Sequence, residues 1–363
     1  MAKINIGFIG AGGIARAHAY TLNSLRYFYD DAPEIALWSV SSAREKSRLR
    51  FAETYGFSMA EEPDDFFNNK FLDAVYILGP NNVHFEHLKQ ALAMPNVAYI
   101  YLEKPVCASQ KEEEDIRNLL SSIKESVKVQ VGFQFLLQPS VREALAFWKS
   151  GILGKPLHFD IKYYHGDYLK KTYRDKRKTR LTPAPDGGAM ADLGSHGISL
   201  AMAFFGEKMQ ILHALQAGNF DDVPAGSDLF SCLSLVDKTT KLVGTLSASR
   251  ISSGTGDLVQ LEIYAEKGAL RFDSRQSDSF EYFFEETGCW VRQPVGSNYV
   301  PVTSFPSGHV PPGWLRSMMH AHYLFLGGND EKAFIPDLAH GLAVQRIVRE
   351  TATHLAVFRD EIA

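Results

Sequence analysis

Short apolar stretches alternate with longer amphipathic ones over the first 135 residues. Because several of the short stretches are apolar on both faces, they fit strands inside a parallel sheet covered by helices. Amphipathic stretches such as 15–25 and 44–55 indicate the helices between them. The pattern predicts an open α/β domain with a doubly wound parallel sheet. Its strands are expected at 4–9, 35–40, 71–78, 97–102 and 126–132.

The pattern changes after about residue 135, where the strands alternate polar and apolar residues. Neighbouring strands are joined by short turns such as Glu266-Lys267-Gly268, which predicts an open, mostly antiparallel or mixed sheet within an α+β domain. Helices are expected at 141–150, at about 190–205 and at about 339–357. The strands of this second sheet are expected at 157–164, 228–236, 241–249, 258–265 and 269–273.

A glycine turn follows the first expected strand and opens a helix. Gly10-x-Gly12-x-x-Ala15 fits the dinucleotide-binding fingerprint, in which glycines allow a tight turn and a close approach of the backbone to a pyrophosphate. Gly13 and Ile14 begin the helix, whose free N–H groups attract phosphate. We therefore expect Gly10, Gly12, Gly13 and Ile14 to bind a dinucleotide; the alternative is a strand–helix turn that binds nothing.

The end of the second expected strand carries Ser41, Ser42 and Arg44. In dinucleotide-binding folds an acidic residue at this place binds the ribose 2′-hydroxyl of NAD. Ser42 stands where that carboxylate is expected, and Arg44 adds a cation two residues later. A hydroxyl with a cation suits a 2′-phosphate, so the sequence favours NADP over NAD. The alternative is that Ser42 caps the following helix.

Polar residues follow the third and fourth expected strands. Pro80, Asn81 and His84 come after the third, and Glu103 and Lys104 after the fourth. Ligands bind at the carboxyl ends of the strands in such sheets, so we expect these residues on the cofactor side. For His84, a purely structural role is the alternative.

A second informative stretch surrounds Asp192 and His196, which follow Gly187 and Gly188. Residues four apart on a helix lie on one face, and a carboxylate beside a histidine suits a general acid or base near neutral pH. The alternative is a surface or capping pair. A zinc site is not expected, because no third ligand stands near in sequence.

A basic run precedes the stretch around Asp192 and His196. Residues 170–180 carry seven basic side chains against one acidic. The run is either a solvated loop or a flap that favours an anionic substrate or the cofactor phosphate.

Composition narrows the class of protein further. A length of 363 residues suggests two domains, and the formal net charge of −4 argues against a nucleic-acid partner. No apolar run approaches the length of a membrane span, so no membrane partner is expected. Three scattered cysteines fit a reducing compartment, hence the cytoplasm, and show no metal-like spacing.

Taken in order, these motifs resemble the glucose–fructose oxidoreductase / inositol dehydrogenase (Gfo/Idh/MocA) family. The resemblance rests on the fingerprint, the turn 80–84, Glu103-Lys104-Pro105, and the stretch 187–196. Residues 269–272 after Lys267-Gly268, and Pro336-Asp337, are similar to the family as well. The resemblance covers nearly the whole chain.

The resemblance implies a dinucleotide-binding Rossmann domain at 1–135 and a substrate and oligomerisation domain at 136–363, whose last helix could pack back on the first. It implies hydride transfer between nicotinamide, as NAD or NADP, and a hydroxyl-bearing carbon of a sugar, polyol or related cyclic alcohol. Lys104, Asp192 and His196 are then catalytic, and Glu103 lies near the nicotinamide. A homo-oligomer, dimer or tetramer, through the open sheet is expected.

The chain also departs from the family pattern. Many members carry Asp where this chain has Ser199, and residues 132–139 are apolar where many members place Arg or another polar group. Both departures weaken the case for a heavily hydroxylated sugar. Two other functions stay open: a non-catalytic nucleotide-binding regulator, and a lyase or epimerase that uses its cofactor transiently.

Overall fold

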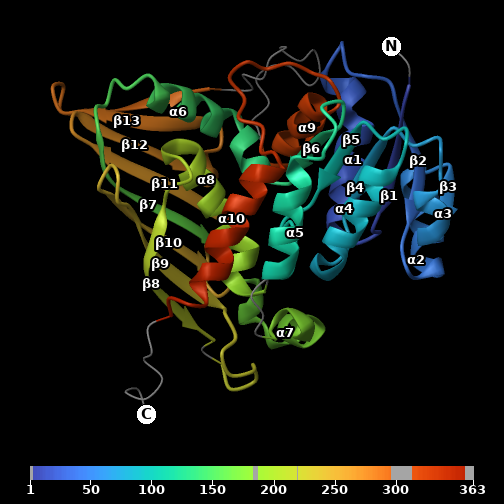
Figure 1. The fold of residues 1–363 in the computed structure, drawn as a ribbon. Coiled ribbons are helices and arrows are strands. Elements are labelled where there is room, and N and C mark those ends of the chain that lie inside the picture. Colours follow the sequence, from blue (N-terminus) through green and yellow to red (C-terminus); the bar gives the residue numbers. More distant parts are fainter. Residues whose placement is uncertain (1–2, 183–186, 219, 296–312, 356–363) are drawn as a thin grey trace. The chain divides into compact units, whose positions relative to one another are not determined.

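The protein is described by a computed structural model, which covers residues 3–182, 187–218, 220–295 and 313–355. The chain forms two compact units (Figure 1). The first comprises Met1–Pro139 with Gly296–Leu342, and the second comprises Ser140–Val295 with Ala343–Ala363. None of the helices in the described ranges is both long and apolar enough to cross a lipid bilayer.

The first unit contains a six-stranded parallel sheet in the order β3-β2-β1-β4-β5-β6. The chain turns from one half of the sheet to the other beside β1, and ligands bind at such a switch point in α/β folds. The predicted parallel sheet is confirmed. Its strands are β1 (Ile4–Ile9), β2 (Ile35–Ser41), β3 (Met59–Glu61), β4 (Ala74–Ile77), β5 (Tyr99–Leu102) and β6 (Lys128–Val131).

Helices of the first unit follow the strands. The fingerprint opens α1, and a 3₁₀ turn at Asn81–Val83 leads into α4. Two glutamates of the first turn and a Ser109 capping box begin α5. The helices are α1 (Gly13–Phe28), α2 (Glu45–Tyr55), α3 (Pro63–Phe67), α4 (His84–Ala93), α5 (Gln110–Leu120) and α9 (Trp314–Phe325).

Helix α9 belongs to the core of this first unit, although the sequence analysis placed its segment in the second domain. Tyr323 stacks on Tyr29 of α1 with ring centroids 4.0 Å apart. Phe325 packs edge-on against Tyr101 of β5. These aromatic contacts join residues more than 220 positions apart, so no local pattern could predict them.

The second unit contains an eight-stranded mixed sheet in the order β14-β13-β12-β11-β7-β10-β9-β8. The described pairs are antiparallel except for β7 with β10. The predicted mostly antiparallel sheet is confirmed. Its strands are β7 (Pro156–Tyr164), β8 (Gln210–Ala217), β9 (Phe230–Asp237), β10 (Leu242–Ser249), β11 (Leu258–Ala265), β12 (Gly268–Asp273), β13 (Ser279–Phe284) and β14 (Cys289–Pro294).

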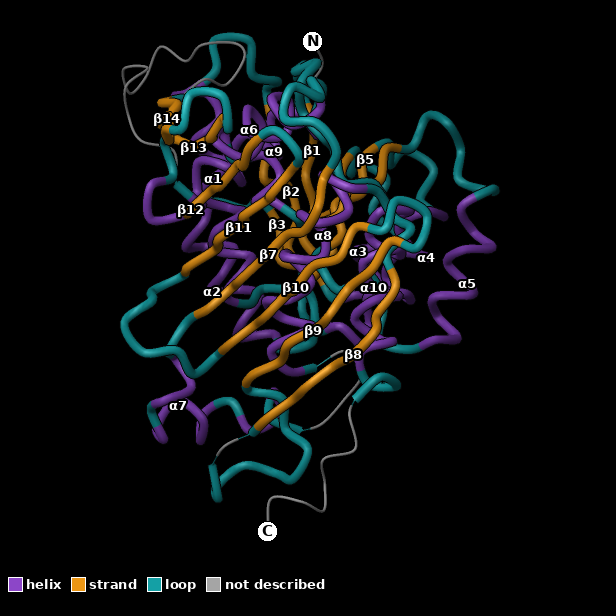
Figure 2. The backbone as a smooth tube through the Cα atoms, turned by 90° about the vertical axis from the view of Figure 1, so that its left-hand side faces the viewer, coloured by secondary structure: helices purple, strands orange, loops and turns teal. Residues whose placement is uncertain are grey.

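The two faces of this sheet differ. Helix α8 (Ser195–Phe205) packs on one face, where a Cβ on Gly197 would lie 3.0 Å from Ile161 of β7. The other face of the sheet is toward the viewer in Figure 2. Along β7, buried residues such as Ile161 alternate with half-buried polar residues such as Asp160 and Lys162. The unit also contains α6 (Pro139–Lys149) and α7 (Lys171–Lys176).

The last described helix, α10, runs from Leu338 to Thr351. Its residues 338–342 are grouped with the first unit and 343–351 with the second. It corresponds to the helix expected at 339–357, of which 356 and 357 lie outside the described residues.

Candidate active site

The fingerprint turn forms an open cradle at the start of α1. Gly10 has a φ of +123°, and a Cβ there would lie 2.5 Å from the backbone of Leu78. An added Cβ on Gly12 or Gly13 would meet no atom within 4 Å. Gly12 is the N-cap and supplies no side-chain cap, so the first N–H groups of the helix remain for a ligand. These residues fit a dinucleotide pyrophosphate; Ile14 is half-buried in the first turn.

The end of β2 places Ser41 in the interior and Ser42 and Arg44 toward solvent. Ser41 is fully buried, Ser42 is half-buried and Arg44 is exposed. The Ser42 hydroxyl donates to the Arg44 carbonyl at 3.3 Å, and Arg44 itself is the N-cap of α2. The structure therefore does not show Ser42 as the helix cap.

His84 connects two turns at the carboxyl ends of neighbouring strands. Its Nδ1 lies 2.7 Å from the Pro105 carbonyl and its Nε2 lies 3.0 Å from the Gly79 carbonyl. Burial lowers the pKa of His84, and a neutral ring donates to one of these carbonyls at a time. His84 thus holds the turn that carries Pro80 and Asn81 beside the turn that carries Lys104.

Glu103 and Lys104 follow β5 directly. The Glu103 carboxylate is buried: its Oε1 lies 2.9 Å from Nε2 of His18. Gly132 makes room for it, because a Cβ there would lie 2.7 Å from the same oxygen. Lys104 is half-buried, and the Lys104–Pro105 peptide is cis. The two adjacent residues therefore differ in setting, one enclosed and one partly open to solvent.

In the second unit, Asp192 lies in a short π-helical segment, Met190–Gly194, that leads into α8. Its carboxylate accepts a hydrogen bond from Nη2 of Arg250 at 2.9 Å, and Nη1 of Arg180 lies 3.8 Å away. The Arg250 side chain is 3% exposed and its guanidinium lies over the ring of Tyr168, 4.8 Å from the centroid. The Asp192 carboxylate thus lies beside two guanidinium groups. Irregular π turns of this kind are frequent at functional sites.

His196 is buried in the first turn of α8. Its ring lies 5.8 Å, between centroids, from that of Tyr163 on β7. Burial keeps the pKa of Tyr163 well above its ordinary value, so the phenol stays protonated. Because the π turn precedes α8, Asp192 and His196 do not share one regular α-helical face, which the sequence analysis had expected.

The glycine pair before this helix serves a close approach. Gly188 has a φ of +82°, and a Cβ there would lie 2.5 Å from the Asp228 side chain. The Asp228 carboxylate accepts hydrogen bonds from the Met190 N–H at 2.9 Å and the Ser231 hydroxyl at 2.8 Å. Asp228 therefore fixes the entry to the helix of Asp192 and His196 against β9.

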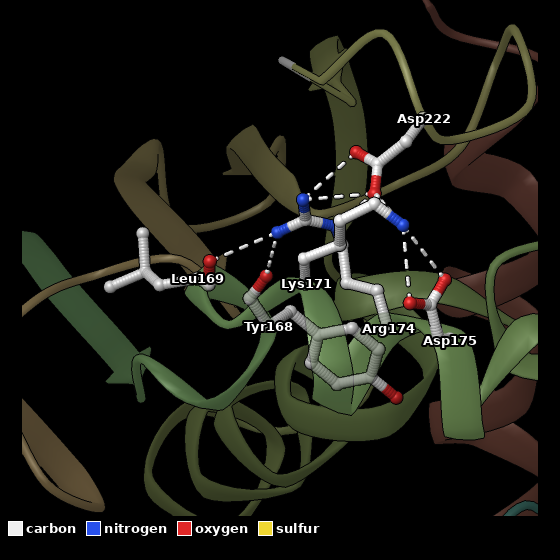
Figure 3. A network of polar contacts seen from close by, with 6 residues as sticks. All are labelled: Tyr168, Leu169, Lys171, Arg174, Asp175 and Asp222. Carbon is white, nitrogen blue, oxygen red and sulfur yellow. Dashed lines mark hydrogen bonds and ion pairs between the residues drawn. The ribbon is translucent and has the colours of Figure 1, made fainter.

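The basic run 170–180 is an ordered segment around α7 and not a plain solvated loop. Arg174 is buried and forms a bidentate ion pair with Asp222 (Figure 3). It also donates to the carbonyls of Tyr168 and Leu169 at 2.7 and 3.0 Å. Arg174 therefore has a structural role, whereas the other six basic residues of the run are exposed.

The predicted residues fall on both units. Gly10–Ile14, Ser41–Arg44, Pro80–His84 and Glu103–Lys104 belong to the first, and Asp192 and His196 to the second. Within the part of the chain that the structure describes, no group of three or more His, Cys, Asp or Glu side chains could hold a metal ion.

Two family models match the chain, one on each side of residue 135. The model described as an oxidoreductase family with an NAD-binding Rossmann fold matches residues 4–133, and the model of the GFO/IDH/MocA C-terminal domain matches 141–271. The chain belongs to the Gfo/Idh/MocA family. The resemblance found from the motifs is therefore confirmed, and so is the class of NAD-dependent oxidoreductase.

Named relatives of this family member include two bacterial dehydrogenases. Glucose-6-phosphate 3-dehydrogenase of Bacillus subtilis is 27% identical over 203 residues, which span 55% of this chain and 53% of that protein. Levoglucosan dehydrogenase of Pseudarthrobacter phenanthrenivorans is 23% identical, over 96% of this chain and 95% of that protein.

Solved structures share the fold over nearly the full length. A levoglucosan dehydrogenase complexed with NADH and levoglucosan superposes with a TM-score of 0.82 at 18% identity, covering 97% of both chains. An inositol dehydrogenase homologue from Azotobacter vinelandii, complexed with NADH and myo-inositol, gives 0.76 at 16% identity, covering 95% of this chain and 93% of that one.

The motif search missed Arg250, His18 and Asp228. Arg250 directly follows β10 and lies 58 residues from the aspartate it binds, so only the tertiary structure reveals the pair. His18 lies on the apolar face of α1, where a histidine gives no signal of its own. A charged residue at the end of an apolar strand, as with Arg250, is the one local hint that was available.

Proposed function

We propose that this family member is a dehydrogenase that transfers a hydride between nicotinamide and a hydroxyl-bearing carbon of a sugar, polyol or related cyclic alcohol. The observation that carries the proposal is the buried His196 that follows, in the same helical segment, a carboxylate held by Arg250. An alcohol loses a proton as its hydride leaves, and these groups suit that proton transfer.

The roles of the residues follow from their chemistry. Bound nicotinamide would accept or donate the hydride at its C4. His196 takes the hydroxyl proton or returns it, and the Lys104 ammonium stabilises the negative charge that develops on the oxygen. Asp192, held by Arg250, accepts a hydrogen bond from a neighbouring substrate hydroxyl. Either Lys104 or His196 can be the formal base.

The cofactor residues are the fingerprint cradle, Gly10 to Ile14, the residues Ser41, Ser42 and Arg44, the turn of Pro80, Asn81 and His84, and Glu103 with Lys104. We propose that NADP is preferred over NAD. Two features support this: Ser42 stands where a carboxylate would repel a 2′-phosphate, and the exposed Arg44 adds a cation two residues later. The named structural relatives were solved with NADH, so both cofactors belong in the test.

The oligomeric state and the cellular location are also proposals. The half-buried polar face of the second sheet supports a homo-oligomer that pairs through this face, as a dimer or tetramer. The low cysteine content supports a cytoplasmic location.

The test is spectrophotometric. Purified protein is mixed with NAD⁺ or NADP⁺ and levoglucosan, glucose 6-phosphate or myo-inositol, the compounds in the relatives' names. The proposal predicts a rise in reduced-cofactor absorbance with at least one polyhydroxy substrate. Cofactor binding without turnover would instead identify a regulator. Substrate conversion without net change in cofactor would identify a lyase or epimerase.

A further inference from the structure

A chain of buried hydrogen bonds leads from the core of the first unit to Glu103. The Tyr76 hydroxyl lies 3.3 Å from Nδ1 of His322, and His322 Nε2 lies 2.9 Å from Nδ1 of His18. His18 Nε2 lies 2.9 Å from Glu103 Oε1. Both histidines are 0% exposed and stand 304 residues apart in sequence, on α9 and α1.

The donors and acceptors of this chain match. Burial and the neighbouring His18 lower the pKa of His322 well below its ordinary value, so His322 is neutral and has one N–H. With one proton on each ring, Tyr76 donates to His322, His322 to His18 and His18 to Glu103.

The end of the chain lies at a functional position. Glu103 directly precedes Lys104, and its carboxylate fits against Gly132, where a Cβ would lie 2.7 Å away. His18 is on α1, the helix whose N-terminus forms the pyrophosphate cradle. The same helix therefore sets both the cradle and the carboxylate beside Lys104.

We propose that His18 and His322 are positioning residues, which orient the Glu103 side chain and fix the Glu103–Lys104 turn against α1 for the nicotinamide end of the cofactor. The proposal rests on the proposed function, in which Glu103 and Lys104 face that end. It assigns to α9, a segment matched by neither family model, a direct part in the cofactor site.

Helix α9 offers a matched control two residues away. His320 is also 0% exposed, and its Nδ1 lies 2.7 Å from the Tyr29 hydroxyl. Its Nε2 lies 3.3 Å from Asp330, so this second chain ends on a carboxylate other than Glu103. Replacing His320 perturbs the packing of α9 without removing a link to Glu103.

The experiment compares His322→Leu, His322→Gln and His320→Leu in the full-length protein. NADH and NADPH affinities are measured by fluorescence titration, and melting temperature reports packing. His322→Leu removes the group that donates to His18. It should weaken binding of the cofactor that the wild type binds more tightly by about tenfold. His322→Gln, whose amide both donates and accepts, should restore most of this loss. His320→Leu should lower the melting temperature by about as much as His322→Leu does, yet change the affinity for that cofactor less than about twofold.

Imidazole ¹⁵N NMR gives a readout independent of cofactor. His18 and His322 are assigned by comparing spectra of the wild type and the variants. The proposal predicts a proton on Nε2 of each ring. An unprotonated His18 Nε2, or equal affinity losses in His322→Leu and His320→Leu, overturns the positioning role while the proposed function stands. A wild type that binds neither cofactor overturns the proposed function and the positioning role together.

Discussion

The two candidate catalytic segments hold their carboxylates in different ways. Glu103 of the first unit is enclosed and accepts from a histidine, whereas Asp192 of the second is 27% exposed and is held by guanidinium groups. Guanidinium groups stay charged at every physiological pH, whereas burial and the neighbouring His18 lower the pKa of His322 well below its ordinary value. The comparison teaches that fixed charges hold the carboxylate of the second segment, whereas hydrogen bonds through buried histidines orient that of the first.

The largest expected effect comes from removing the proposed proton-transfer group of either unit. Lys104→Ala and His196→Ala should each lower turnover at least ~100-fold, the usual scale for general acid–base groups. Steady-state rates at saturating cofactor measure this loss. Near-normal rates in both variants would refute the assignment of both segments to catalysis.

The next largest effect is expected from removing the contact between Arg250 and Asp192. Arg250→Met removes the buried guanidinium that donates to Asp192 and should cost about 2–3 kcal/mol of stability, together with activity. Denaturant unfolding measures this cost. Arg180→Met is the matched control, because Arg180 is 55% exposed and 3.8 Å from Asp192, so its loss should change stability little. Equal effects of the two substitutions would contradict the central place given to Arg250.

The cofactor preference predicts a smaller effect, which is confined to the binding of NADPH. Arg44→Ala should weaken NADPH binding about tenfold, since a charge-assisted contact with the 2′-phosphate is lost, and leave NADH binding unchanged. Fluorescence titration with both cofactors checks it. An equal loss for NADH and NADPH would place Arg44 outside the 2′-phosphate site.

The sequence predicted the parallel sheet, the mostly antiparallel sheet and the motif-bearing turns, because these depend on local periodicity and on glycine spacing. It did not predict β3, β8, β13, β14 or α9. Strand β3 has three residues, and β8, β13 and β14 show little regular alternation of buried and exposed residues. The fixed partners of Glu103 and Asp192 were missed because each comes from a distant part of the chain.

The smallest expected effect is the pH dependence of stability in the first unit. The folded-state pKa of His322 lies below its unfolded value of about 6.5, so the unfolded chain binds the extra proton first. The stabilisation from neutral His322 is therefore fully present above about pH 6.5 and declines as pH falls, by at most about 1.4 kcal/mol per pH unit. Urea unfolding is measured between pH 5 and 8, and the free energy of unfolding is plotted against pH. The slope should be shallower in His322→Gln than in wild type; identical slopes would contradict a buried neutral His322.

The measurement that tests the central claim most directly is the turnover of the Lys104→Ala/His196→Ala double variant beside its two single variants. Groups that serve one proton transfer act as a unit, so the account predicts that the double variant falls about as far as the slower single variant. Losses that simply multiply would show that the two residues act in separate steps, and would contradict a shared substrate hydroxyl.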